Sequence, residues 1–206
     1  GLGKDKLFGG AGRDVLRFDE LTTASGVIAN LATSKASFED QGDGFRFIRF
    51  EDLVGTAYAD TLTGSDVANS LAGGDGADTL SGGAGDDVLI GGAQGDVMDG
   101  GLGADTFVYT SKTDSPMGGV DTIRMFDKGQ DKIDLSALDA VLGGADDAFG
   151  FIGTQAFGAG GACVRYQRND AGGTTLIELC LAGSSSPDMQ LVLGGLYDLT
   201  AASFVL

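Results

Sequence analysis

Acidic side chains return at a fixed spacing through the middle of the chain. Every ninth residue from position 60 to position 105 is an aspartate or an asparagine, namely Asp60, Asn69, Asp78, Asp87, Asp96 and Asp105. Regularly spaced carboxylates suit a hard cation such as calcium, which takes six to eight oxygen ligands. The sequence contains no histidine, which excludes a histidine-ligated zinc site, a Ser-His-Asp triad and a Cys-His pair within the chain. These residues therefore indicate metal binding rather than hydrolysis.

Glycines and large apolar residues keep the same spacing. With the frame set by GGDGADTLS at 73–81, glycine-rich stretches alternate with short apolar-centred stretches from position 55 to position 108. The frame also fits GGAGRDVLR at 9–17 and a clipped GLGKDKLF at 1–8, which contains Asp5. The eighth position of each unit is apolar: Leu7, Leu16, Leu62, Leu71, Leu80, Leu89, Met98 and Phe107. A flexible glycine-rich linker, the alternative interpretation, has no reason to keep apolar side chains in phase.

The nonapeptide G-G-x-G-x-D-x-U-x is a known signature of a calcium-binding parallel β-helix. In each unit, six residues form a turn that uses backbone angles open to glycine. The other three form a short strand whose middle side chain points inward. Two units complete one coil, so each unit stacks on the second unit along the chain. The sequence therefore predicts an all-β fold, a parallel β-roll with a narrow core of eighth-position residues.

This stacking predicts two files of cation ligands. They are Asp60, Asp78 and Asp96 in the first file and Asn69, Asp87 and Asp105 in the second. Carboxylates in neighbouring coils, about 5 Å apart, would repel each other, and calcium bound between them and the turn carbonyls would convert this repulsion into cross-links. Magnesium demands a rigid octahedron and keeps its own waters, so calcium fits better. Without calcium we expect largely unfolded repeats, because the core is narrow and ordering glycine is entropically costly.

The frame weakens in places and ends after Val108. GTAYAD and GSDVAN lack the second and fourth glycines, and Gln94 takes the fourth position of GGAQGD. Asp114, Asp121 and Asp131 follow the last repeat and either close the final sites or are ordinary turn aspartates. The complete set of predicted metal-site residues is Gly10, Gly12, Asp14, Asp60, Asn69, Gly74, Gly76, Asp78, Gly83, Gly85, Asp87, Gly92, Asp96, Gly101, Gly103, Asp105, Asp114, Asp121 and Asp131.

The charge balance narrows the choice of partners. The chain has 30 acidic and 13 basic residues, which gives a formal net charge of −17. This charge repels nucleic acids and anionic membranes, and no apolar run approaches the about 18 residues that span a bilayer. The start, GLGKDKLFGG, lacks the basic and apolar segments of a secretory signal peptide. It reads as the middle of a repeat, so we expect the chain to be the C-terminal part of a longer protein. Separately, we expect a monomer.

Residues 18–54 depart from the repeat. They contain β-branched and aromatic stretches such as FRFIRFEDLV, which are typical of strands. Either the solenoid continues here without calcium ligands, or the segment is a loop packed on the roll. We assign residues 1–126 to the roll, with this interruption included, and residues 127–206 to a β-rich C-terminal cap.

Residues 162–181, ACVRYQRNDAGGTTLIELCL, predict a β-hairpin around the turn NDAGG. Pairing Arg168 with Thr175 places Cys163 directly opposite Cys180. Directly opposed residues of an antiparallel pair have Cα atoms about 4.5 to 5.5 Å apart, within the range of a disulfide. We expect the bond to form in an oxidising exterior. The alternative is two adjacent but unbonded thiols, because the cytosol keeps thiols reduced.

Three stretches resemble the C-terminal domain of serralysin-type metalloproteases, calcium-binding repeat proteins exported by type I (ABC) secretion. They are GGLGADTFVYTSKTDS, VDTIRMFDKGQDKIDLSAL and the ending LTAASFVL. The resemblance implies a right-handed parallel β-roll, several bound calcium ions with Asp114, Asp121 and Asp131 as terminal ligands, a β-rich cap, and an uncleaved export signal read by the ABC secretion apparatus. Alginate-epimerase R-modules have similar nonads and a similar tail. Ser203 departs from the family pattern, in which an acidic residue usually precedes the final apolar triplet, and so do the two cysteines.

These observations favour a secreted, extracellular, non-catalytic module. We expect it to fold on calcium binding outside the cell and to support the secretion and stability of a larger protein, such as a serralysin-like protease. The alternative is a module that binds an extracellular polysaccharide, for which Arg46 and Arg49 with Phe45 and Phe47 are the densest candidate grip, although core strand positions explain the phenylalanines more simply. A third hypothesis, an enzyme using its aspartates as acid and base, is weaker because periodic aspartates suit ligands better. We therefore assign no catalytic residue.

Overall fold

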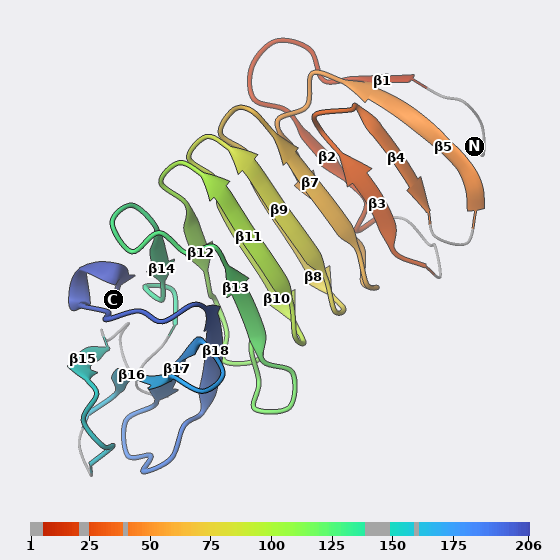
Figure 1. Ribbon diagram of the computed structural model, residues 1–206. Coiled ribbons are helices and arrows are strands. Elements are labelled where there is room, and N and C mark those ends of the chain that lie inside the picture. Colours follow the sequence, from red (N-terminus) through yellow and green to blue (C-terminus); the bar gives the residue numbers. More distant parts are fainter. Residues whose placement is uncertain (1–5, 21–24, 39–40, 139–148, 159–160) are drawn as a thin grey trace.

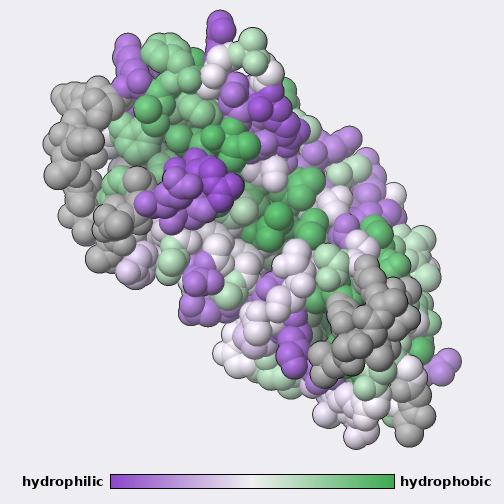
Figure 2. Space-filling view, turned by 180° about the vertical axis from the view of Figure 1, so that it is seen from behind, coloured by the Kyte–Doolittle hydropathy of each residue, from purple (hydrophilic) through white to green (hydrophobic). Residues whose placement is uncertain are grey.

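The computed structural model describes residues 6–20, 25–38, 41–138, 149–158 and 161–206. The chain forms an elongated stack of strands with its two termini at opposite ends (Figure 1). Seen from behind, hydrophilic and hydrophobic patches are interspersed along its length (Figure 2). In the described residues the secondary structure is β apart from one short 3₁₀ helix, and no helix there is long and apolar enough to cross a membrane. Asp5 lies outside the described residues.

Two sheets face each other to form the roll. In the repeat region successive strands alternate between the two sheets, so neighbours within one sheet are every second strand along the chain. Sheet A contains, in spatial order, β1 (Lys6–Phe8), β5 (Gln41–Ile48), β4 (Lys35–Phe38), β3 (Val27–Asn30), β7 (Thr61–Ser65), β9 (Thr79–Ala84), β11 (Val97–Leu102), β13 (Asp121–Arg124), β18 (Met189–Gly194), β17 (Thr174–Cys180), β16 (Cys163–Asn169) and β15 (Gly150–Gly153). Sheet B contains β19 (Phe204–Val205), β14 (Lys132–Asp134), β12 (Thr106–Val108), β10 (Val88–Ala93), β8 (Ser70–Asp75), β6 (Asp52–Val54) and β2 (Val15–Arg17). The 3₁₀ helix η1 (Ala201–Ser203) precedes β19.

The register confirms that each nonad stacks on the second nonad along the chain. Leu62 pairs with Leu80 across parallel strands β7 and β9, and Leu71 pairs with Leu89 across β8 and β10. The eighth-position residues from Leu62 to Phe107 are at most 1% exposed. The predicted parallel β-roll with a narrow apolar core is therefore confirmed.

Leu7 is the exception among the eighth-position residues. It is 40% exposed and lies on β1, the outermost strand of sheet A, which has a neighbour, β5, on one side only. The prediction that the eighth position always lies in the core is wrong for this residue. Leu16 also lies on an outermost strand, β2 of sheet B, yet it is only 7% exposed, so an edge position alone does not decide the burial of an eighth-position residue.

The interruption at 18–54 combines parallel and antiparallel strands. β3 is parallel to β7 and β6 is parallel to both β2 and β8, so each sheet continues through the segment. β4 and β5 run antiparallel and are inserted between β3 and β1. Phe47 is 1% exposed and Phe45 packs against Phe18 with ring centroids 5.9 Å apart. Phe18 and Phe47 therefore belong to the core, and Phe38, Phe45 and Phe50 are partly buried against it.

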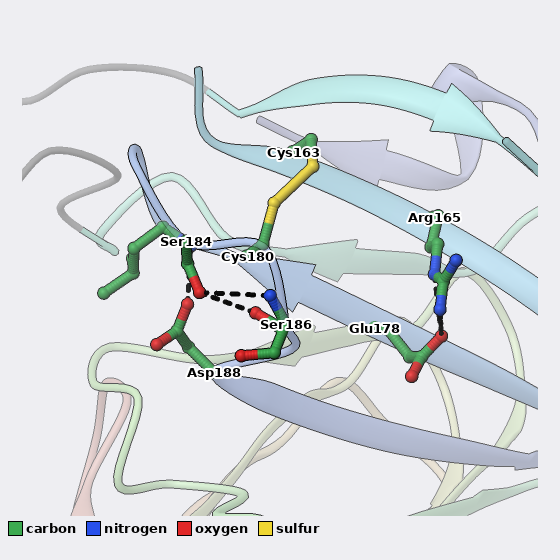
Figure 3. The surroundings of a disulfide bond; sticks show 8 residues. Cys163, Arg165, Glu178, Cys180, Ser184, Ser186 and Asp188 are labelled. Atoms are coloured by element: carbon green, nitrogen blue, oxygen red, sulfur yellow. Dashed lines mark hydrogen bonds and ion pairs between the residues drawn. A yellow bond between two sulfur atoms is a disulfide. The ribbon is translucent and has the colours of Figure 1, made fainter. Parts of the chain in front are cut away.

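The C-terminal hairpin has the predicted register. Across β16 and β17, Arg168 pairs with Thr175 and Cys163 pairs with Cys180. The two cysteines form a disulfide with their Cα atoms 5.3 Å apart, next to an ion pair between Arg165 and Glu178 on the same hairpin (Figure 3). The predicted disulfide is confirmed.

Strands on both sides of residue 126 share the two sheets. β18 lies parallel to β13 in sheet A, and β14 lies parallel to β12 in sheet B. The division into a roll at 1–126 and a cap at 127–206 stays a prediction, and the cap continues both sheets of the roll.

Candidate metal centre

The glycines of the repeat are required by the turn geometry. Gly74 has φ of +112°, a region that side chains rarely adopt. A Cβ at this position would also overlap the carbonyl oxygen of Thr56 in the preceding coil. The other predicted-site glycines with positive φ are Gly10, Gly12, Gly76, Gly83, Gly85, Gly92, Gly101 and Gly103.

The first file of aspartates forms a ladder between coils. The backbone amide of Asp60 donates to Oδ1 of Asp78 at 2.7 Å, and that of Asp78 donates to Oδ1 of Asp96 at 2.8 Å. The amide of Asp96 then donates to Oδ1 of Asp121 at 2.8 Å, across 25 residues. These aspartates are at most 3% exposed. The structure therefore places Asp121 in the file, although the nine-residue spacing has ended before it.

The second file has the same construction. The amide of Asn69 donates to Oδ1 of Asp87 at 2.8 Å, that of Asp87 to Oδ1 of Asp105 at 3.0 Å, and that of Asp105 to Oδ1 of Asp131 at 3.0 Å. Asp131 thus extends this file as Asp121 extends the first.

At the other end of the second file, the amide of Asp14 donates to Oε2 of Glu51 at 2.9 Å. Sequence reasoning missed Glu51, because it lies in the interruption. The sequence did contain one signal for Glu51: it precedes Asn69 by 18 residues, which is the length of one coil.

One oxygen of most file aspartates has no hydrogen-bond donor. The buried atoms without a partner include Oδ2 of Asp14, Asp78, Asp87, Asp96, Asp105 and Asp121. A buried carboxylate oxygen without a partner is strongly unfavourable, so it requires a proton or a cation. Burial raises the pKa of Asp78 and of Asp121 to about 8. Burial also raises the pKa of Asp87 and of Asp96 to about 6.

A second oxygen from the neighbouring coil lies close to these atoms. A Cβ added at Gly73 would overlap Oδ2 of Asp78 and would lie 2.5 Å from the carbonyl oxygen of Gly91. The same arrangement recurs at Gly82, with Oδ2 of Asp87 and a glycine carbonyl of the next coil. A carboxylate and a carbonyl from adjacent coils thus converge at both glycines, and both are oxygen donors of the kind that calcium prefers.

The two nonads that lack the second and fourth glycines contain their own hydrogen-bond donors. In GTAYAD, the amide of Thr56 donates to Oδ2 of Asp60 at 2.5 Å, and its hydroxyl donates to Oδ1 at 3.0 Å. In GSDVAN, the amide and hydroxyl of Ser65 donate to Oδ1 of Asn69 at 2.7 and 3.1 Å. The backbone amide of the second-position residue, Thr56 or Ser65, therefore donates to the side-chain oxygen in these nonads, whereas Oδ2 of the aspartate in the glycine nonads has no partner. This explains physically why sites at Asp60 and Asn69 are expected to be weaker.

Asp114 and Asp131 also find donors in their own turns. Oδ2 of Asp114 accepts from the amides of Thr110 and Ser111 at 2.7 and 2.9 Å, and Oδ2 of Asp131 accepts from the amide of Asp127 at 2.7 Å. Asp114 therefore accepts hydrogen bonds within its own turn and does not join a file. This arrangement resembles that of an ordinary turn aspartate, the alternative that the sequence left open. Its negative charge nevertheless contributes, after burial, to the raised pKa of Asp121.

Side chains alone do not form a complete cage. In the part of the chain that the structure describes, no three Asp, Glu or Cys side chains converge on one point. Calcium bound here would need main-chain carbonyls in addition to carboxylates, as the stacked turns provide. The ligand roles of the predicted residues remain predictions.

Comparison with known proteins identifies the family. A family model described as Peptidase M10 serralysin C terminal matches residues 1–206. The chain belongs to this serralysin C-terminal family. The resemblance inferred from the nonads and the tail is therefore confirmed, while no curated protein sequence matches the chain.

Two solved structures share the fold of this family member. The AlgE6R3 subunit of the Azotobacter vinelandii mannuronan C5-epimerase is 32% identical, with a TM-score of 0.53, and the match covers 72% of this chain and 78% of that one. The AlgE6R2 subunit of the same enzyme is 31% identical, with a TM-score of 0.56, and the match covers 74% and 91%. The predicted similarity to epimerase R-modules is also confirmed.

A separate feature of this serralysin C-terminal domain is a groove of about 560 Å³ at the N-terminal end of sheet A. Lys6 and Lys35 both pair with Arg46 across neighbouring strands, so three cations stand side by side. In the described part of the chain, none of them takes part in an ion pair. Ile28 and Phe45 add apolar surface to the groove. Of the predicted polysaccharide grip, Arg46 and Phe45 line this groove.

Proposed function

We propose that the chain is a non-catalytic calcium-binding module that folds when it meets calcium outside the cell. In this role it supports the type I secretion and the stability of a larger secreted protein, which we take to be a serralysin-like protease. The observation that carries the proposal is the convergence of buried, unpartnered aspartate oxygens with carbonyls of the next coil, as at Gly73. The chemistry of the parent protein would lie in another segment.

Calcium binding supplies the free energy that the repeat itself lacks. Without a cation, folding buries carboxylate oxygens that have no donor, and the chain carries a net charge of −17, so the extended state is favoured. Extracellular calcium modules have dissociation constants on the order of 10⁻⁴ to 10⁻³ M. At a tenfold excess over the dissociation constant, each bound ion stabilises the folded state by about 1.4 kcal/mol. On the order of eight ions would offset nearly all of the net charge.

The C-terminal tail couples folding to export in this proposal. Phe204 is 6% exposed and pairs with Ile133 between β19 and β14. The side-chain amine of Lys132 donates to the carbonyl of Ala202 in the adjoining η1. A tail packed in this way is presented to an exporter only while the chain is unfolded, which low cytosolic calcium would ensure. The disulfide between Cys163 and Cys180 is consistent with an oxidising destination.

Circular dichroism on the purified chain tests the central claim. A chelator is expected to abolish most of the β signal, and added calcium is expected to restore it together with a compact monomer. Magnesium at the same concentration should fail to do so, because it resists dehydration. An unchanged spectrum in excess chelator would overturn the proposal.

A second candidate function is binding of an acidic extracellular polysaccharide. The observation that favours it is the groove with Lys6, Lys35 and Arg46 on adjacent strands, in a chain that is otherwise strongly acidic. Adjacent strands lie about 4.8 Å apart, comparable to the length of one sugar residue, so the row matches a polymer with one carboxylate per residue. The two solved relatives come from an enzyme that is named for a polyuronate.

Titration with alginate and with a neutral glycan tests this second function. We expect binding to alginate alone, and weakening in a variant with Lys35→Gln and Arg46→Gln. The control variant Arg124→Gln removes an exposed cation from β13, far along the same sheet, and should bind normally. Equal weakening in both variants would indicate non-specific charge attraction.

A further inference from the structure

Ser115 stands at the C-terminal end of the first file of aspartates. Along this file the backbone amide of each member donates to Oδ1 of the next, and the last such step runs from Asp96 to Asp121. The amide of Asp121 donates instead to Oγ of Ser115, at 2.8 Å. Ser115 is 0% exposed. A buried serine hydroxyl therefore takes the role that an aspartate oxygen has in the preceding steps.

The strand that follows β13 in sheet A has no aspartate at this level. β13 pairs in parallel with β18, and the register places Asp121 opposite Leu191. The next member of the file would stand where Leu191 is, because file residues of neighbouring coils occupy equivalent positions. Leu191 is 0% exposed and its side chain is apolar, so it cannot accept a hydrogen bond. Ser115 thus supplies the acceptor that β18 lacks.

Ser115 also binds β18 directly. Its hydroxyl donates to the carbonyl of Gln190 at 2.5 Å, across 75 residues of the chain, and the amide of Gln190 donates to the carbonyl of Ser115 at 3.4 Å. A serine hydroxyl has one proton to donate and lone pairs that accept. The same oxygen therefore accepts from Asp121 while it donates to β18. One buried side chain joins the end of the file to a strand of the C-terminal segment.

The strand that Ser115 binds is in turn held to the C-terminal hairpin. The side-chain amide of Gln190 donates to Oε1 of Glu178 at 3.0 Å, and Arg165 donates to Oε2 of the same carboxylate at 2.8 Å. Glu178 is 4% exposed and lies on β17, which pairs antiparallel with β18. Figure 3 shows this ion pair beside the disulfide. Polar contacts therefore connect the hairpin, β18 and the end of the first file.

The second file ends in a different way. The amide of its last member, Asp131, donates to the carbonyl of Asp127 at 2.7 Å. This step is completed within one turn of the chain. The link from a file amide through a serine hydroxyl to β18 thus belongs to the first file.

We propose that Ser115 couples the docking of β18 to calcium binding at the C-terminal end of the first file. Asp121 has a buried Oδ2 without a partner, and Ser115 fixes the backbone from which that carboxylate extends. Ser115 is therefore a positioning residue and not a ligand. Because coupling between two binding events is reciprocal, docking of β18 strengthens calcium binding at Asp121 as much as calcium strengthens docking. The inference rests on the proposed calcium-binding function and deepens it.

Hydrogen exchange of the purified chain, measured across a calcium titration, tests the coupling. In the wild type, protection of β18 and of β13 should rise over the same range of calcium. In Ser115→Ala the calcium midpoint for protecting both strands should be about threefold to tenfold higher, the effect of losing one or two hydrogen bonds. The midpoint for β9, two strands away from β13 in sheet A, should stay unchanged. The control is Ser111→Ala, which removes a hydroxyl of the same turn that contacts Thr113 and should leave every midpoint unchanged.

The outcomes separate the coupling from the proposed function. A β18 midpoint that is the same in wild type and Ser115→Ala would overturn the coupling and leave the function intact. Equal shifts at β9 and β18, or a variant that stays unfolded in saturating calcium, would assign Ser115 a general role in stability and would also overturn it. Protection of β18 in the wild type without calcium would have the same meaning. A wild-type chain whose protection never depends on calcium would overturn the function as well.

Discussion

The backbone amide of Asp78 donates a hydrogen bond of 2.8 Å to Oδ1 of Asp96, 18 residues further along the chain, while Oδ2 of Asp96 is buried without a partner. One oxygen of each such aspartate therefore holds two coils together, and the other is left for a ligand. Because its two oxygens have separate roles, one side chain per nonad serves both the fold and the proposed binding of calcium.

The first prediction compares a proposed calcium ligand, Asp87, with an acidic residue of the repeats that is not a proposed ligand, Asp75. Asp87→Ala should raise the calcium concentration needed for folding, because it removes both the buried Oδ2 and the acceptor for Asn69. Asp75→Ala changes an exposed residue at the third position of its nonad and should have little effect. Calcium titrations followed by circular dichroism measure both midpoints. Similar midpoints for the two variants would show that the nonad frame does not define the ligands.

The second prediction concerns the space beside a repeat glycine. In Gly73→Ala the added methyl would overlap Oδ2 of Asp78 and would approach the carbonyl of Gly91. We expect weaker calcium binding, which calorimetry would detect. Gly118→Ala is the matched control, since a Cβ there has no atom within 4 Å. Normal calcium binding by Gly73→Ala would contradict the placement of the ion between these oxygens.

The third prediction is a pH dependence of opposite sign with and without calcium. The pKa of Asp78 is raised by burial from 3.8 to about 8, and that of Asp87 to about 6. A group whose pKa is higher in the folded state stabilises that state at low pH, and this stabilisation is lost as the pH rises through the folded-state pKa. The metal-free fold should therefore be more stable at about pH 5 than at about pH 8.5.

Calcium affinity should change in the opposite direction, because protons compete with the cation for the same oxygens. The residual β signal in metal-free buffer, followed by circular dichroism as the pH is changed, and calcium titration at each pH check the two signs. The variant Asp78→Asn should show a smaller dependence for the metal-free fold. Metal-free stability that rises with pH would contradict the assignment of these buried carboxylates.

The fourth prediction tests the core. Leu89 is 0% exposed, and Leu89→Ala should destabilise the calcium-bound state by about 2 to 5 kcal/mol. Leu102 is 73% exposed, so Leu102→Ala should change stability by no more than about 0.5 kcal/mol. Urea unfolding in saturating calcium measures both values, and a small effect of Leu89→Ala would argue against a continuous core ladder.

The fifth prediction concerns the disulfide between Cys163 and Cys180, which are separated by 17 residues. For so short a loop the chain-entropy gain is about 3 kcal/mol at most, so the variant with both cysteines changed to serine should be destabilised by that amount or less. It should still fold on calcium addition, because the bond lies in the hairpin and not in the repeat turns. Loss of the calcium response in this variant would show that the hairpin controls the roll.

Where the coil length is constant, neighbours in space followed from counting along the chain. Two nine-residue units return the backbone to the same place, so the pairing of Leu71 with Leu89 and the file order of Asp87 and Asp105 were predictable. The register of Cys163 with Cys180 was predictable for a similar reason, since a short turn leaves an antiparallel hairpin only one simple alignment.

Only the tertiary structure decided the position of Glu51 and the hydrogen bonding of Asp60. Coil length varies in the interruption at 18–54, and the hydrogen-bond partners come from other parts of the coil or from other coils. Glu51 reached the second file through a segment that mixes parallel and antiparallel strands, where counting by nine gives no register. Likewise, Asp60 and Asp78 occupy the same position of their nonads, yet only Asp78 keeps a buried oxygen without a donor. The backbone amide of Thr56 donates to Oδ2 of Asp60, whereas the equivalent residue beside Asp78, Gly74, has φ of +112° and gives Oδ2 of Asp78 no hydrogen bond.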